Sequence, residues 1–95
     1  MTRDAAFPSG LEHVVDAYGC NEEALRSRVT LERLLSQIIE DLGLRAIGEQ
    51  AWHTFPGPAG LTGLVMLSES HLSVHTFPEN RYAAVNLYCC RRKAE

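Results

Sequence analysis

The chain has 95 residues and a formal net charge of −3, from 9 basic and 12 acidic side chains. This charge argues against nucleic acid and against an anionic membrane as the main partner. The length predicts a single domain over residues 1–95. Because so short a chain buries only a modest core, we expect it to associate at least as a dimer. The sequence contains no run of about 18 apolar residues, so we expect no membrane span.

The N-terminus and the cysteines indicate a cellular compartment. Residues 1–4 include an acidic side chain and lead into no apolar stretch, so we expect no secretory signal. The cysteines are odd in number, which favours reduced thiols in the cytoplasm; they are Cys20, Cys89 and Cys90. The basic cluster at residues 91–93 is interpreted as a solvated chain end.

The first half of the chain predicts a strand and a long helix. Residues 11–18 are typical of a strand, although their apolar spacing also fits a short helix. Asn21 is a good N-cap for a first helical turn. Leucine and isoleucine then recur at helical spacing over residues 31–42, which predicts one apolar face that packs on a sheet. We expect Thr30 to cap the start of this helix and Gly43 its end.

The second half predicts strands. Residues 44–54 are expected to form a strand, and the Pro and Gly content of residues 55–60 indicates a loop. Residues 61–67 are strongly apolar and predict a buried strand, residues 71–76 alternate between apolar and polar, and residues 82–90 predict the last strand. This order predicts the α+β class: a two-layer sandwich of an antiparallel sheet covered by helix.

The polar residues that interrupt the strands have ordinary interpretations when each is taken alone. Ser70 is typical of a strand end at the surface, His75 of a hydrogen-bonded histidine, and Cys89 or Cys90 of a small core residue. Ser70 and His75 are five residues apart, so on a plain strand they point to opposite faces. A turn or bulge near Ser70 would let them converge.

Taken together, these residues form a longer pattern. Residues 67–79 read LSESHLSVHTFPE, and they are followed by YAAV at residues 82–85 and by Cys90. This pattern resembles the self-processing segment of the prokaryotic S-adenosylmethionine decarboxylases, without gaps over residues 62–90. A weaker resemblance covers residues 11–25.

The resemblance implies a cofactor that the chain makes from itself. Ser70 would attack the carbonyl of Glu69, and the Glu69–Ser70 bond would break to give chains 1–69 and 70–95. Ser70 would end as a pyruvoyl group, which forms a Schiff base with the substrate amine and accepts the electrons left by decarboxylation. No metal and no pyridoxal phosphate is expected.

The resemblance also implies roles for other residues. His75 would accept a proton during self-processing, which suits an imidazole. Thr62 lies where the family usually has a serine that supports processing, and threonine keeps the hydroxyl. Cys90 would return a proton to the product carbanion, with Cys89 as its structural neighbour. The thiol of Cys89 is the alternative proton donor.

Three residues are expected to bind substrate. Phe77 lies where the family usually has a tryptophan or another aromatic residue, and it would stack on an adenine ring. Phe55 is a candidate for the opposite face of that ring. Glu79 would accept hydrogen bonds from a ribose or meet a cationic substrate, and the alternative is a plain turn carboxylate beside Pro78.

The sequence departs from the family pattern in two ways. Family members usually continue with another helix and strand, which we expect to be missing here, so that a partner chain would cover the sheet or the protein would be a fragment or a reduced variant. Asn86 lies where aspartate is usual, and Phe77 replaces the common tryptophan. Relatives with changed pockets decarboxylate arginine or ornithine.

The resemblance therefore predicts a pyruvoyl-dependent S-adenosylmethionine decarboxylase that supplies the aminopropyl donor for spermidine, acting as a homodimer of processed protomers with active sites near the interface. The first alternative is the same machinery acting on arginine or ornithine. The second is a non-catalytic truncated homologue that binds or regulates a partner subunit. A metal site at His71, His75, Cys89 and Cys90 is a weak third, because no spacing matches a known zinc pattern.

Overall fold

The computed structural model describes residues 10–89 of the chain. The elements follow one another as β1 (Leu11–Tyr18), α1 (Glu22–Leu25), α2 (Arg28–Asp41), β2 (Ala46–Thr54), β3 (Leu61–Leu67), β4 (Ser70–Phe77), the 3₁₀ helix η1 (Pro78–Asn80) and β5 (Tyr82–Cys89). The predicted strand at residues 11–18 is confirmed, and the alternative of a short helix there is wrong.

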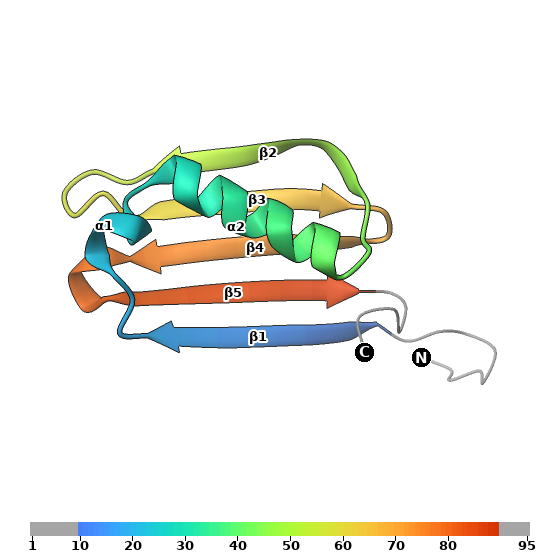
Figure 1. Ribbon diagram of the computed structural model, residues 1–95, viewed down its shortest axis with the longest axis horizontal. Coiled ribbons are helices and arrows are strands. Elements are labelled where there is room, and N and C mark those ends of the chain that lie inside the picture. The colour runs from blue at the N-terminus through green and yellow to red at the C-terminus, as the bar shows by residue number, and fades with distance from the viewer. Residues whose placement is uncertain (1–9, 90–95) are drawn as a thin grey trace, which may run out of the picture.

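The strands form one antiparallel sheet in the order β1-β5-β4-β3-β2 (Figure 1). The β4–β5 hairpin lies between β1 and β3, so β1, from the start of the chain, pairs with β5, from its end. In the β1–β5 ladder, Leu11 lies opposite Cys89 and Tyr18 opposite Tyr82. The predicted α+β class, with an antiparallel sheet and a helix packed on it, is confirmed.

Helix α2 covers one face of this sheet (Figure 1). Its apolar stripe puts Leu31 and Leu35 into the interior, where they are 3% and 0% exposed. The strands beneath contribute every second residue to the core, as the pleat requires; the buried cluster consists of Leu35, Val65, Leu67, Leu72, Val74, Leu87 and Cys89. The amphipathic helix and the alternating strands therefore bury one common layer.

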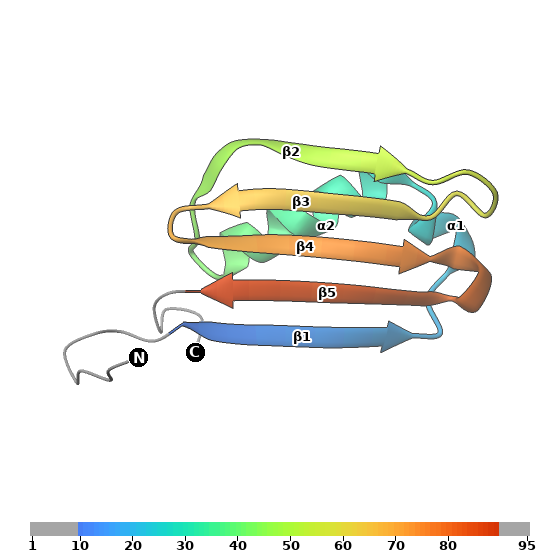
Figure 2. The ribbon, with the colours of Figure 1, turned by 180° about the vertical axis from the view of Figure 1, so that it is seen from behind.

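The opposite face of the sheet carries no helix from residues 10–89 (Figure 2). The prediction that residues 61–67 form a strand is confirmed, but the strand is buried on one side only. Leu64 and Met66 point to this open face and remain 47% and 60% exposed. We name this surface, which Figure 2 presents, the open face.

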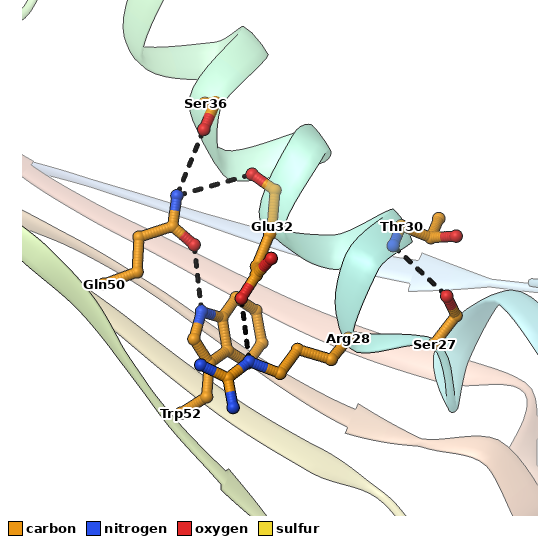
Figure 3. Close-up of polar contacts among 7 residues, drawn as sticks. All are labelled: Ser27, Arg28, Thr30, Glu32, Ser36, Gln50 and Trp52. Atoms are coloured by element: carbon orange, nitrogen blue, oxygen red, sulfur yellow. Dashed lines mark hydrogen bonds and ion pairs between the residues drawn. The ribbon is translucent and has the colours of Figure 1, made fainter.

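The N-terminal end of α2 differs from the prediction, whereas its C-terminal end agrees with it. Ser27, not Thr30, is the N-cap: its hydroxyl oxygen accepts a hydrogen bond from the Thr30 backbone N–H at 3.2 Å (Figure 3). Gly43 follows the helix with φ +67°, as expected for a residue just past a helix end. The Leu44 N–H donates to the Ile39 carbonyl at 2.9 Å, so Leu44 completes the helix end and β2 begins only at Ala46.

A polar bridge fixes α2 to the edge strand β2. The Gln50 side-chain amide donates to the Ser36 hydroxyl at 3.1 Å and its carbonyl accepts from the Trp52 indole N–H at 2.9 Å (Figure 3). The Trp52 ring lies so close to Gly63 on β3 that a Cβ there would come within 2.4 Å of it. Glycine at residue 63 therefore lets the ring lie flat on the sheet beneath the helix.

The N-cap can be tested by substitution. We expect Ser27→Ala to lower the free energy of unfolding by about 1 kcal/mol, because the Thr30 N–H loses its acceptor, and to lower Tm by roughly 4–8 °C. Thr30→Ala is the matched control and should leave Tm nearly unchanged. A larger loss for Thr30→Ala than for Ser27→Ala in thermal melts would contradict this assignment.

Candidate active site

Ser70 is the first residue of β4 and follows a tight turn. Ser68 and Glu69 form a two-residue turn that joins β3 to β4. Ser70 lies opposite Leu67 on one side and opposite Cys89 on the other. Ser70 is half-buried while Glu69 is exposed, so the peptide bond between them lies at the surface, at one end of the sheet.

A pocket of about 300 Å³ lies at the opposite end of β4. Figure 2 shows the two places at the two ends of the sheet: the β3–β4 turn at one end, and at the other end the loop of residues 55–60 that joins β2 to β3. The pocket brings together five of the residues singled out from the sequence; they are Phe55, Thr62, His75, Phe77 and Glu79.

Thr62 and His75 form a hydrogen-bonded pair in this pocket. They lie directly opposite each other on β3 and β4, and the Thr62 hydroxyl lies 2.9 Å from Nδ1 of His75. His75 is exposed on the open face. A hydroxyl that holds one ring nitrogen orients the imidazole and leaves the other nitrogen able to exchange a proton with a ligand.

Aromatic rings border the pocket on both sides. Phe77 stacks on Tyr82 with ring centroids 5.5 Å apart, and Phe55 packs edge-on against His53 at 4.6 Å. Phe55 and Phe77 are 48% and 37% exposed, so each presents ring surface to solvent. Such half-exposed rings can hold a planar apolar ligand between them.

Tyr82 is itself fixed by a carboxylate on the neighbouring strand. Its hydroxyl donates to Asp16 Oδ1 at 2.6 Å, and this hydrogen bond, helped by the negative charge of Asp16, raises the pKa of Tyr82 from 10.0 to about 12. Tyr18 packs on the other side of Tyr82 at 5.2 Å. The ring that supports Phe77 is therefore held in place from β1.

Hydrogen bonds also hold the loop of residues 55–60. The Phe55 N–H donates to the Gly60 carbonyl at 2.8 Å, and Arg26 Nε donates to the Pro58 carbonyl at 3.0 Å. The buried Thr76 hydroxyl accepts from the Leu61 N–H and donates to the Leu25 carbonyl, each at 2.9 Å. The pocket wall is thus tied to α1 and does not depend on the loop alone.

Ser70 and His75 do not converge within the chain. The β3–β4 ladder is regular from Ser70 to His75, without the bulge that would bring them together. Ser70 and His75 are five residue steps apart, which is about 16 Å along β4, and their side chains point to opposite faces. The hypothesis that a local irregularity brings these two residues together is therefore wrong for one chain. Cys90 lies outside the described residues.

Comparison with known proteins decides the family. The sequence profile of the S-adenosylmethionine decarboxylase family matches residues 11–95. The chain belongs to the S-adenosylmethionine decarboxylase family. The match confirms the resemblance over residues 62–90. It also confirms the prediction of a decarboxylase at the level of the family.

Relatives with similar sequences are named S-adenosylmethionine decarboxylase proenzymes. The relative from Caldicellulosiruptor saccharolyticus is 36% identical over 86 residues, which cover 90% of this chain and 68% of that protein. The relative from Clostridium kluyveri is 39% identical over 84 residues, which cover 85% and 63%. The chain therefore spans about two thirds of the length of the curated relatives it matches.

A solved structure supports the same assignment. The crystal structure of the adenosylmethionine decarboxylase from Aquifex aeolicus matches with a TM-score of 0.81 and 32% identity, covering 94% of this chain and 73% of that one. The sheet order and the helix packing described above are thus the fold of this family.

Several supporting residues were missed by the sequence pattern. Asp16, His53 and Arg26 lie outside the family motif, yet they contact Tyr82, Phe55 and the 55–60 loop respectively. Their roles depend on strand register and loop shape, which no local spacing reveals. Asn86, where the family usually has aspartate, donates to Glu12 at 2.6 Å on the neighbouring strand.

The described residues provide no sign of two other kinds of site. Within residues 10–89, no three histidine, cysteine or acidic side chains gather closely enough to hold a metal ion, and the weak alternative of a metal site gains no support there. Neither helix in the part of the chain that the structure describes is long and apolar enough to span a membrane.

The environment of Tyr82 predicts a distinct titration. Because the folded state favours the neutral phenol, the stabilisation is complete below pH 10 and is lost as the pH rises through about 12. We expect Asp16→Asn to return the pKa of Tyr82 toward its ordinary value, measured by NMR of ¹³C-labelled tyrosine. Tyr82→Phe assigns the signal, and an unchanged pKa in Asp16→Asn would contradict the role of Asp16.

Proposed function

We propose that this chain is a self-processing proenzyme that cleaves its Glu69–Ser70 bond and decarboxylates S-adenosylmethionine. The proposal is supported by relatives named S-adenosylmethionine decarboxylase proenzymes. The observation that carries the proposal is the position of Ser70 in a chain of this family. It heads an ordered strand directly after an exposed two-residue turn. A nucleophile is thereby held next to the carbonyl that it must attack.

The cleavage step uses atoms that the chain already holds. Ser70 Oγ attacks the Glu69 carbonyl carbon, the C–N bond breaks, a C–O bond forms, and the hydroxyl proton passes to the freed nitrogen. Loss of the Ser70 α-proton then breaks the ester C–O bond and leaves Glu69 as a carboxylate. One water hydrolyses the resulting enamine, and ammonia leaves. Each step needs a base to move a proton, which suits the paired His75.

The residues present fit a pyruvoyl group at residue 70. Ser70 is followed at once by a strand that is hydrogen-bonded on both sides, so a group formed at its head stays fixed to the sheet. The pyruvoyl group supplies a carbonyl that accepts electrons from the decarboxylated substrate. Cys90 remains our proposed proton donor to the product.

The sheet explains how two chains could stay together after cleavage. The 70–95 chain would contribute β4 and β5, which lie between β3 and β1 of the 1–69 chain. The short chain therefore keeps a full ladder on each side, and Leu72, Val74 and Leu87 remain in the core. Cutting the exposed turn removes none of these contacts.

The pocket favours S-adenosylmethionine over the alternative substrates. Phe55 and Phe77 offer two half-exposed ring faces that could hold the adenine base, which arginine and ornithine lack. Glu79 lies at the same pocket and could accept hydrogen bonds from the ribose. In this proposal the product supplies the aminopropyl group for spermidine synthesis. No feature of the pocket favours arginine, ornithine or a purely regulatory role.

The separation of Ser70 from the pocket supports a homodimer with composite sites. Since His75 lies about 16 Å along β4 from Ser70 of the same chain, the pocket of one copy would serve Ser70 of the other. The open face offers apolar surface for such a contact; Val14, Ile47, Leu64 and Met66 are 61%, 44%, 47% and 60% exposed. A two-fold axis would create two identical sites.

The first test is the intact mass of the purified protein under denaturing conditions. We expect two chains that separate between Glu69 and Ser70, with the mass of the smaller one showing a pyruvoyl group. Carbon dioxide release should then be measured with S-adenosylmethionine, arginine and ornithine.

Ser70→Ala is the matched variant for this test, because it removes one oxygen and leaves the ladder intact. We expect it to remain a single chain and to lose decarboxylation entirely. Cleavage in Ser70→Ala, or a wild-type chain that stays whole over days, would contradict the proposal and favour the regulatory homologue.

Composite sites predict complementation between two inactive variants. Ser70→Ala keeps the pocket, and His75→Ala keeps the nucleophile, so neither homodimer should process. When the two are co-expressed with different tags, we expect the His75→Ala chain to be cut by the pocket of its partner. Mixed dimers, isolated through both tags, in which that chain remains whole would show that His75 does not act across the interface.

A further inference from the structure

The residue just before the proposed cleavage point has an unusual backbone conformation. Glu69 has φ +66°, in the left-handed region that residues with a Cβ avoid because the Cβ approaches the following carbonyl oxygen. Most of the described positions with positive φ are glycine, namely Gly19, Gly43, Gly48 and Gly57, and the non-glycine ones besides Glu69 are Ala59 and Arg81. Glu69 differs from Ala59 and Arg81 because it lies at the proposed cleavage point.

The surrounding ladders hold Glu69 in this conformation. Leu67 and Ser70 are directly paired across β3 and β4, so only Ser68 and Glu69 are available to reverse the chain. Turns this short commonly have positive φ at a central residue, and in this turn Glu69 is the residue that adopts it. Ser70 is also paired with Cys89 on the other side, so the strand cannot shift to relax the turn.

We propose that this strain at Glu69 drives the first step of self-cleavage, an inference that rests on the proposed function. When the Glu69 carbonyl moves from the Ser70 nitrogen to Ser70 Oγ, the C–N bond breaks, a C–O bond forms and the hydroxyl proton goes to the nitrogen. The link from the Glu69 carbonyl carbon to the Ser70 Cα then runs through Oγ and Cβ, one atom longer than through the nitrogen. The longer link frees Glu69 to leave the left-handed region.

Strain relief matters at this step because an ester is normally less stable than the amide it replaces. Energy stored in the intact turn is released only along the path to cleavage, since the two ladders prevent other ways of relaxing it. Glu69 is in this sense a positioning residue: its backbone, and not its carboxylate, promotes the reaction.

The test compares Glu69→Gly with Glu69→Ala. Both variants remove the carboxylate, but only glycine removes the Cβ that makes positive φ unfavourable. We expect the first-order cleavage rate of Glu69→Gly, followed by denaturing mass spectrometry, to be several-fold lower than that of Glu69→Ala.

A second readout measures the strain without any cleavage. On the uncleavable Ser70→Ala background, Glu69→Gly should melt a few degrees above Glu69→Ala, because glycine relieves the turn. Gly48→Ala is the control elsewhere: Gly48 also has positive φ, +75°, but it lies in the edge strand β2. It should lower Tm and leave the cleavage rate within about two-fold, since the added strain is remote from the bond.

The outcomes separate this inference from the proposed function. Equal cleavage rates in Glu69→Gly and Glu69→Ala, or a faster rate with glycine, would overturn the inference while leaving self-cleavage in place. Equal melting temperatures on the Ser70→Ala background would also overturn it, because no strain would then be stored. A wild-type chain that never cleaves would overturn the proposed function and this inference with it.

Discussion

The hydrogen-bonded ladders on both sides of β4 determine most of what this molecule can do. They hold Ser70 against Leu67 and Cys89 at one end, and they set His75 opposite Thr62 toward the other. Because a strand rises by a fixed length per residue, the same ladders that order these two groups also keep them apart. One strand therefore carries Ser70 at its head and His75, paired with Thr62, near its tail, and the ladders fix the spacing between the two positions.

The two faces of the sheet differ in burial and in the residues that they carry. Helix α2 buries the face formed by Val65, Leu72 and Val74, and this layer provides the stability of the domain. The open face carries His75, Thr62 and the aromatic rings of the pocket, together with exposed Leu64 and Met66. Exposed apolar residues grouped on one surface are typical of a contact region. The pocket and the proposed association would thus share the open face, while the Ser70 side chain points to the opposite face.

Much of the fold could be predicted from local patterns, and the parts that could not are those that depend on distant residues. The helical stripe around Leu35 and the alternation around Leu72 indicate both elements and the buried side of each. Ser27 and Thr30 both suit the N-cap position, so the local pattern does not decide between them. Only the hydrogen bond from the Thr30 N–H to the Ser27 hydroxyl identifies Ser27 as the N-cap. At the site, the family motif indicated the residues of the pocket, but the pairing of Thr62 with His75 follows from strand register. The support of Phe77 through Tyr82 and Asp16 joins residues 66 positions apart in sequence, which no local pattern reveals.

The position of β4 and β5 between β1 and β3 affects how the protein can unfold and refold. While the chain is whole, unfolding and refolding involve one polypeptide. If Glu69 and Ser70 are separated as proposed, the central strands β4 and β5 belong to a second polypeptide, and unfolding separates the two. Refolding would then be a bimolecular encounter whose yield depends on concentration. The topology thus implies that the cleaved protein, once denatured and diluted, would have no intramolecular route back to the fold.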